Sequence, residues 1–184
     1  MSIIATSTTG TYVSAMLIAK PPNEFSEKDL TAFVDLVVSE GEVSPYRLLE
    51  RVKRARGLVM IYDGEILVGT AAVKNPEPGY RADVFAKSKS RADDTTYPIE
   101  LGYVVVAESH RGQGLSWSLV DAAMPFANGS AQYATTRGSN VAMQRVLPAR
   151  GFAADGFPYP SVEHPGEDIH LFLRASDLPG ATSE

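Results

Sequence analysis

Residues 104–116 read VVVAESHRGQGLS, and this stretch decides the fold. Three consecutive valines close a β-rich run, and the residues after Gly112 carry apolar side chains at helical spacing. Between the two runs lie Gly112 and Gly114, which let the backbone turn without Cβ clashes and let an anion approach closely. The free N–H groups of a helix's first turn, together with the helix dipole, favour negative charge. Arg111 adds a positive charge, so the stretch predicts a strand, a site for a pyrophosphate and a helix.

Two other phosphate-binding loops do not match this stretch. A P-loop requires the pattern GxxxxGK[ST], and no such lysine is present. A Rossmann fingerprint requires GxGxxG, and Trp117 occupies the position of the third glycine. An isolated RGQG also fits a capped surface helix with a solvated arginine, so the elements around it must decide.

The composition indicates one ordinary globular domain. The chain has 184 residues, of which 44% are hydrophobic and 21% charged, with a net charge of −5. The acidic balance disfavours a nucleic-acid partner. The absence of cysteine excludes disulfides and a cysteine acyl-enzyme, and the three histidines lack zinc-ligand spacing, so no metal is expected. No signal peptide or membrane-spanning run is found, so we expect a cytoplasmic protein without a membrane partner.

Periodicity and turn residues predict the remaining elements. Strands are expected at 12–20, 58–62, 66–73, 99–106, 132–136, 151–155 and 169–173. Helices are expected after a capping box of Ser26 with Asp29, after Ser44-Pro45, at 112–124 and at 140–147. Asp63-Gly64 is expected as a hairpin turn, and 75–96 as a long functional or mobile loop. The order predicts a single α/β (α+β) domain over 12–174, with a mixed sheet and helices on both faces, between a flexible N-terminus (1–11) and a polar tail (175–184).

The strand followed by RGQGLS resembles the signature R/Q-x-x-G-x-G/A of the GNAT superfamily of N-acetyltransferases, with Ser116 in place of the final small residue. Asn140, followed by a helix and Gly151-Phe152, resembles the second half-motif of that family. The order of elements upstream also fits, so the resemblance covers about residues 12–173. It implies a GNAT-like mixed sheet with a splayed motif strand, and acetyl-CoA (coenzyme A) as the cofactor.

The resemblance also implies how the cofactor would be held. Backbone groups around Val104 and Val106 would pair with the pantetheine arm, and an N–H group there would polarise the thioester carbonyl. The amides of 111–116 would hold the pyrophosphate, and Asn140 would orient the pantetheine or a bound water. The cofactor-binding residues expected on this basis are Val104, Val105, Val106, Arg111, Gly112, Gln113, Gly114, Leu115, Ser116 and Asn140.

Without a cysteine, direct attack by the acceptor amine is the simple route, and it requires a deprotonated amine. Glu100 lies four residues before Val104, where some family members carry a catalytic glutamate, and it is the expected general base. An exposed strand residue and an acceptor-binding carboxylate are the alternatives for Glu100. Many relatives carry a tyrosine as general acid seven residues after the motif asparagine, and Leu147 stands there in this chain. Tyr159, Tyr103 or His110 could substitute, and the coenzyme A thiolate can also leave without an acid.

The expected function is acetyl transfer to a primary amine of a small molecule or peptide. A coenzyme A sensor or interaction module without transfer is the alternative, and a nucleic-acid base modifier is disfavoured by charge. Family members often pair through their sheets, so the resemblance also allows a homodimer. Glu40 and Glu42 could attract the acceptor amine, and their alternative is a solvated helix end. Tyr80, Arg81 and Phe85 could form a lid, in which Arg81 would suit a carboxylate or phosphate of the acceptor. Trp117 could be a half-buried surface residue or a contact with a partner or a second copy.

Overall fold

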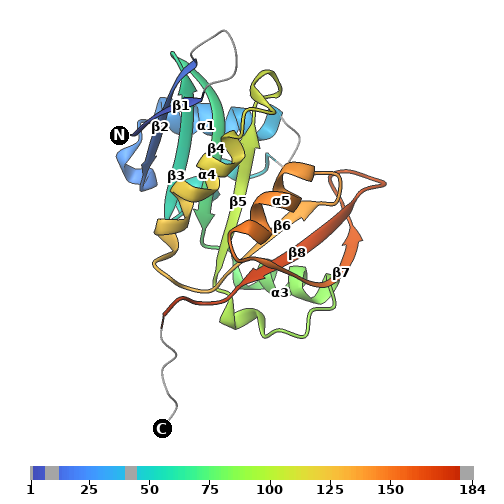
Figure 1. Cartoon of the computed structure of the whole chain (residues 1–184). Coiled ribbons are helices and arrows are strands. Elements are labelled where there is room, and N and C mark those ends of the chain that lie inside the picture. Colours follow the sequence, from blue (N-terminus) through green and yellow to red (C-terminus); the bar gives the residue numbers. More distant parts are fainter. Residues whose placement is uncertain (1, 7–12, 40–44, 179–184) are drawn as a thin grey trace. The chain divides into compact units, whose positions relative to one another are not determined.

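The computed structural model describes residues 2–6, 13–39 and 45–178. The chain divides into two compact units, the first formed by Met1–Lys74 with Gly102–Phe126 and the second by Asn75–Leu101 with Ala127–Glu184. The strands and helices of both units are labelled in Figure 1. Within the described residues the strands are β1 (Ser2–Thr6), β2 (Val13–Lys20), β3 (Gly57–Asp63), β4 (Ile66–Lys74), β5 (Ile99–Val106), β6 (Gln132–Arg137), β7 (Ala153–Pro160) and β8 (Asp168–Arg174). The α-helices there are α1 (Glu27–Ser39), α2 (Leu48–Lys53), α3 (Pro78–Lys87), α4 (Leu115–Ala123) and α5 (Val141–Ala149).

In the first unit, β1 to β4 are antiparallel neighbours, and the later part of β5 lies next to β4 in the strand order. One face of these strands is covered by α1 and α2, whose buried residues pack with Leu58 and Met60 of β3. The opposite face is covered by α4, since Leu119 lies over Gly69 of β4. Residues of β3 alternate between the two faces, as the period of a strand requires. Helices therefore cover both faces of the sheet in this unit.

Helix α1 begins as its sequence predicts. Ser26 Oγ accepts a hydrogen bond from the N–H of Asp29 at 3.1 Å and donates one to Asp29 Oδ2 at 2.7 Å. The backbone N–H of Ser26 also donates to Asp29 Oδ2, at 3.3 Å. This reciprocal arrangement is a capping box that satisfies the first donors of the helix. Leu30, Phe33 and Val37 then form its buried stripe.

In the second unit, the first residues of β5 pair in parallel with β6, and β6 and β7 both pair antiparallel with β8. The parallel ladder between β5 and β6 covers Ile99–Leu101, where β5 belongs to this unit. Phe85 of α3 packs against Tyr133 and Leu171 in a core of this unit. Helix α5 buries Met143, Val146 and Leu147.

The fold class and most elements agree with those predicted from the sequence. The strand order combines antiparallel neighbours with one parallel pair, so the sheet is mixed and the fold is α/β, as expected. In the part of the chain that the structure describes, no helix is both long enough and apolar enough to cross a bilayer.

Several expectations differ from the structure. Helix α2 begins at Leu48 with Arg47 as its N-cap, whereas a start after Ser44-Pro45 was expected, and the strand expected at 151–155 is β7, which extends to Pro160. The stretch 75–96 was expected as a loop, but it contains α3 and a short 3-10 helix, η2 (Asp94–Thr96). Pro78 is the first residue of α3 and lacks only a backbone donor that a helix start leaves unused. The N-terminal stretch, expected to be frayed, contains β1 paired with β2. The hairpin turn lies one residue later than expected, because Asp63 pairs with Ile66.

Candidate functional site

The first unit contains the glycine loop and the residues on both sides of it. Strand β5 ends at Val106, and the N–H of Ala107 donates to the carbonyl of Val68 on β4 at 2.9 Å. A 3-10 turn, η3 (Glu108–His110), follows, and α4 begins at Leu115. The order is the strand, turn and helix that 104–116 predicts.

Gly112 and Gly114 have left-handed backbone conformations, with φ of 78° and 77°. A residue with a Cβ is strained there, whereas glycine is not. A Cβ built on either glycine meets no heavy atom within 4 Å, so the side of the backbone that a side chain would fill is open. Gly114 is the N-cap residue of α4, and as a glycine it has no side chain that could cap the helix. A loop that is open at its two glycines and leads into a helix N-terminus fits an anionic group such as a pyrophosphate.

Two side chains bind the loop to its own unit. His110 Nε2 lies 3.2 Å from Oδ2 of Asp63, which is the last residue of β3. Ser109 Oγ lies 2.8 Å from the other ring nitrogen of His110. Arg111 Nε donates to the carbonyl of Val106 at 3.2 Å. His110 therefore anchors the loop, which is a structural use of a residue considered above as a proton donor.

Strand β5 is irregular at Tyr103, which has a φ of 52° although it is not a glycine. Tyr103 is buried, with Lys74 Nζ 4.4 Å from the centre of its ring and the ring of Phe33 packed edge-on. Thr70 Oγ1 donates to the Tyr103 carbonyl at 3.0 Å, which supports the unusual conformation. A left-handed aromatic residue within a strand is a rare conformation that interrupts the regular ladder. The ladder with β6 ends two residues earlier, at Leu101.

The three valines after this irregularity differ in their surroundings. Val105 is buried in the core formed by α1 and α2, whereas Val104 and Val106 are half-buried. The side chain of Val105 is therefore used in packing, and only its backbone is left for a ligand. Sequence reasoning missed the role of Tyr103, because Gly102 beside it would be the residue expected to adopt such a conformation.

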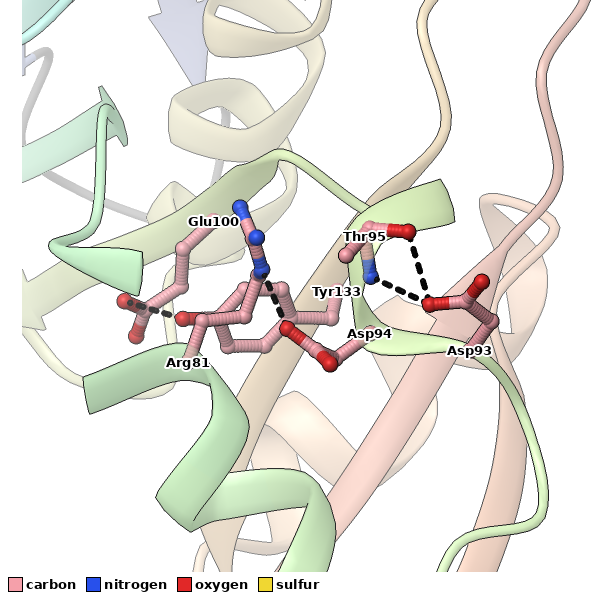
Figure 2. Close-up of polar contacts among 6 residues, drawn as sticks. All are labelled: Arg81, Asp93, Asp94, Thr95, Glu100 and Tyr133. Carbon is pink, nitrogen blue, oxygen red and sulfur yellow. Dashed lines mark hydrogen bonds and ion pairs between the residues drawn. The ribbon is translucent and has the colours of Figure 1, made fainter. Parts of the chain in front are cut away.

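The second unit contains Glu100, the expected base. Glu100 is only 3% exposed, and its Oε2 accepts a hydrogen bond from the Tyr133 hydroxyl at 3.2 Å. The two residues are register partners in the parallel ladder between β5 and β6. Figure 2 shows the Tyr133 hydroxyl reaching one oxygen of the Glu100 carboxylate. The structure excludes the exposed-residue alternative for Glu100.

The negative charge of Glu100 contributes to a raised pKa in two tyrosines. Burial, with the Glu100 carboxylate as the next cause, raises the pKa of the Tyr133 hydroxyl far above its ordinary value. Burial raises the pKa of Tyr159 to about 12, and the negative charges of Glu100 and Asp83 add to this effect. Both phenols therefore stay protonated and able to donate at neutral pH.

An ion pair on α3 lies in the same unit. Arg81 Nε is 2.9 Å from Oδ2 of Asp94 on η2, and only 12% of the Arg81 side chain is exposed. Asp93 caps η2 by accepting bonds from the N–H and the hydroxyl of Thr95, at 2.9 and 2.7 Å (Figure 2). These bonds to Thr95 lower the pKa of Asp93. Sequence reasoning missed two polar residues here, Asp94 and Tyr133. Their contacts with Arg81 and Glu100 join different elements, which only the folded chain brings together.

The remaining candidates have simple structural surroundings. Asn140 Oδ1 accepts from the N–H of Met143 at 3.2 Å, so Asn140 is the N-cap of α5. Leu147 and Phe85 are core residues, and a lid role for Phe85 is therefore wrong. Trp117 is exposed, at 36%, and not half-buried as expected. Glu40 and Glu42 lie outside the described residues.

Solved structures of acyltransferases share this fold. A Salmonella typhimurium protein described as an acetyltransferase, solved with its cofactor acetyl-CoA, is 15% identical at a TM-score of 0.66, with 91% of this chain and 98% of that one covered. An acyl-CoA N-acyltransferase from Pseudomonas aeruginosa is 17% identical at a TM-score of 0.64, with 88% and 100% covered. The ribosomal-protein-S18-alanine N-acetyltransferase from Escherichia coli is 14% identical at a TM-score of 0.62, with 92% and 99% covered.

At these identities the likeness establishes the fold and no more. No curated protein matches the chain significantly in sequence. The family model of the acetyltransferase (GNAT) family, by contrast, matches residues 15–152, which include β2 to β6, the glycine loop and α5. Because that match covers most of the chain, the protein belongs to the GNAT acetyltransferase family.

Proposed function

We propose that the protein transfers an acetyl group from acetyl-CoA directly to a primary amine. The observation that carries this proposal is the loop at the start of α4, where left-handed Gly112 and Gly114 leave the backbone open to an anionic group. Family membership supplies the reaction class, acetyl transfer. When bound, acetyl-CoA would provide an activated acetyl thioester.

The residues of the first unit would hold the cofactor. The amides of Arg111, Gly112, Gln113, Gly114, Leu115 and Ser116 would bind the pyrophosphate at the helix N-terminus. The backbone of Val104, Val105 and Val106 would pair with the pantetheine arm, supported by the irregular conformation of Tyr103, which precedes them. In the second unit, Asn140 uses its Oδ1 to cap α5, so a role in orienting a water would belong to its amide nitrogen.

Glu100 would act as the general base. Its Oε2 accepts a hydrogen bond from Tyr133, and the Glu100 carboxylate would take the proton from the acceptor ammonium. The bond from Tyr133 also holds the carboxylate in one orientation, and orientation precedes proton affinity in deciding whether a base can work. The burial of Glu100 supports this role, because water is largely excluded from its surroundings.

Tyr159 is the proposed proton donor to the departing thiolate. Leu147 provides no proton, Tyr103 is packed in the core, and His110 is bound to Asp63. Tyr159 is half-buried within the electrostatic reach of Glu100, and its pKa of about 12 keeps the hydroxyl protonated. It is the candidate among the four whose surroundings suit donation.

A thiol-release assay tests the function. The protein is mixed with acetyl-CoA and a panel of primary amines, and free coenzyme A is followed by its thiol. We expect release that depends on the amine, and its loss in Gly114→Asp, where a carboxylate would enter the open side of the loop. Glu100→Gln should lower turnover while calorimetric binding of acetyl-CoA is retained. Binding without release on any amine would favour a coenzyme A sensor, and absence of binding would contradict the proposal.

A further inference from the structure

The Arg81 side chain is largely buried, yet within the described part of the chain it makes a single ion pair. Arginine side chains usually keep their charged ends in water, yet only 12% of this one is exposed. Its ion pair with Asp94 is made through Nε, at 2.9 Å, and among the described residues no side chain is hydrogen-bonded to its two η nitrogens. A guanidinium has donors on three nitrogens, and the pair of η nitrogens matches the two oxygens of a carboxylate. Arg81 therefore keeps unused donors that suit an anionic group.

A second charge lies close to Arg81 in the same unit. The Tyr133 hydroxyl is bonded to Glu100, and the pKa of this one phenol is raised by Glu100 and lowered by Arg81. In Figure 2 the hydroxyl of Tyr133 points to Glu100. The charges of a carboxylate and of a guanidinium thus both act on one tyrosine. Tyr80, the neighbour of Arg81 on α3, is 48% exposed, so this part of α3 reaches the protein surface.

We propose that the acceptor carries a carboxylate beside its primary amine, with Arg81 binding the carboxylate and Glu100 facing the ammonium. A free amino acid is the simplest molecule of this class. The inference rests on the proposed function, because it assigns the acceptor of the same reaction. It also defines what is rejected, since the positive charge of Arg81 would oppose a diamine or polyamine that brings a second cation.

Asp94 is a positioning residue in this arrangement. Its carboxylate binds Nε of Arg81. Asp94 lies on η2, whose start is capped by the bonds from Thr95 to Asp93. A single contact at Nε fixes the direction of the side chain without occupying the η nitrogens. Preorganising a long, flexible side chain in this way reduces the entropy lost when the ligand binds.

Matched acceptors test the proposal without depending on absolute activity. The kcat/KM of thiol release is compared for the common L-amino acids and for their amides, which keep the amine and remove the carboxylate. We expect the wild-type protein to prefer at least one acid over its amide by about ten- to hundredfold, the range for a charge-assisted contact. Arg81→Gln should bring that ratio close to one. Arg91→Gln removes the same charge from an exposed residue between α3 and η2 and should leave the ratio unchanged.

Two further arms cover the alternatives. O-phosphoethanolamine and ethanolamine form a phosphate pair, and a preference for the phosphate over every carboxylate would overturn the assignment of a carboxylate. If Arg81→Gln does not fold, the double variant Arg81→Gln/Asp94→Asn removes both charges and leaves no unpaired carboxylate, and it should lose the preference in the same way.

The outcomes separate this inference from the function on which it rests. Turnover of amides as fast as acids by the wild-type protein, or a preference kept in Arg81→Gln, overturns the inference and leaves the acetyltransferase intact. Release with no amine of the panel, despite binding of acetyl-CoA, contradicts the proposed function. In that event, binding of the acids and amides is compared by calorimetry, and equal affinity for the two overturns the inference as well.

Discussion

The Tyr133 hydroxyl donates a hydrogen bond to Oε2 of Glu100 across the parallel ladder between β5 and β6, in which the two residues are direct partners. The bond is 3.2 Å long, and both side chains are buried. A hydrogen bond of this kind holds the carboxylate in one orientation. The pairing of these strands therefore sets the chemistry of the proposed base.

Tyr133→Phe removes this bond and keeps the ring. We expect kcat to fall by about tenfold, because the carboxylate loses the donor that holds it in one orientation. In the wild-type protein, burial and Glu100 raise the pKa of Tyr133 far above 10, so this tyrosine should introduce no loss of activity up to about pH 10. The measurement is kcat/KM against pH for both proteins. An unchanged profile in Tyr133→Phe would separate Tyr133 from the mechanism.

The capping box of α1 predicts a pH-dependent contribution to stability. Hydrogen bonds from Ser26, with a further bond from Tyr62 at 3.0 Å, lower the pKa of Asp29 in the folded protein below its usual 3.8. A lowered folded pKa means that the stabilisation is present above the unfolded pKa and is lost as the pH falls through the folded one. Asp29→Asn should therefore destabilise the protein at pH 7, by less than about 1 kcal/mol because the site is half-exposed. Urea unfolding at pH 7 and pH 3 should show this difference shrinking at the lower pH.

Gly112→Ala and Gly114→Ala test the backbone of the cofactor loop. Each places a Cβ on a left-handed residue, which costs about 1 kcal/mol through strain, and each fills part of the open side of the loop. We expect a small loss of stability together with at least a tenfold weaker binding of acetyl-CoA, measured by calorimetry. Gly79→Ala is the control, since Gly79 is an exposed residue of α3 with free space at its Cβ position. It should raise stability slightly and leave binding unchanged.

The sequence was sufficient for the elements that local pattern determines. Strand β5 has the predicted bounds, because a run of β-branched residues between turn residues leaves little choice. Helix α4 buries Leu115, Leu119, Val120 and Ala123, in agreement with the helical spacing of apolar residues after Gly112. The glycine loop lies between these two elements, so the nearness of this candidate site to a helix N-terminus was also predictable.

Features that depend on contacts between distant residues were not predictable. Helix α3 has a weak apolar pattern and is held by Val84 and Phe85, which pack in the core of the second unit with residues far along the chain. The left-handed conformation of Tyr103 depends on its support by Thr70 on another strand. The pair of Glu100 with Tyr133 depends on a register that short strands specify poorly.

Variants at Leu147 and Tyr159 test which residue donates a proton to the departing thiolate. Leu147 is fully buried in α5, so Leu147→Tyr would overpack the core, lower stability by about 1–3 kcal/mol and restore no proton donor. Tyr159→Phe removes the half-buried hydroxyl whose pKa is about 12, and we expect kcat to fall by about tenfold with little change in the stability. The decisive comparison uses an acyl donor whose thiolate is a better leaving group than coenzyme A. If Tyr159 donates a proton to the thiolate, the loss in Tyr159→Phe should shrink with that donor, whereas a residue that only positions the acceptor would show the same loss with both.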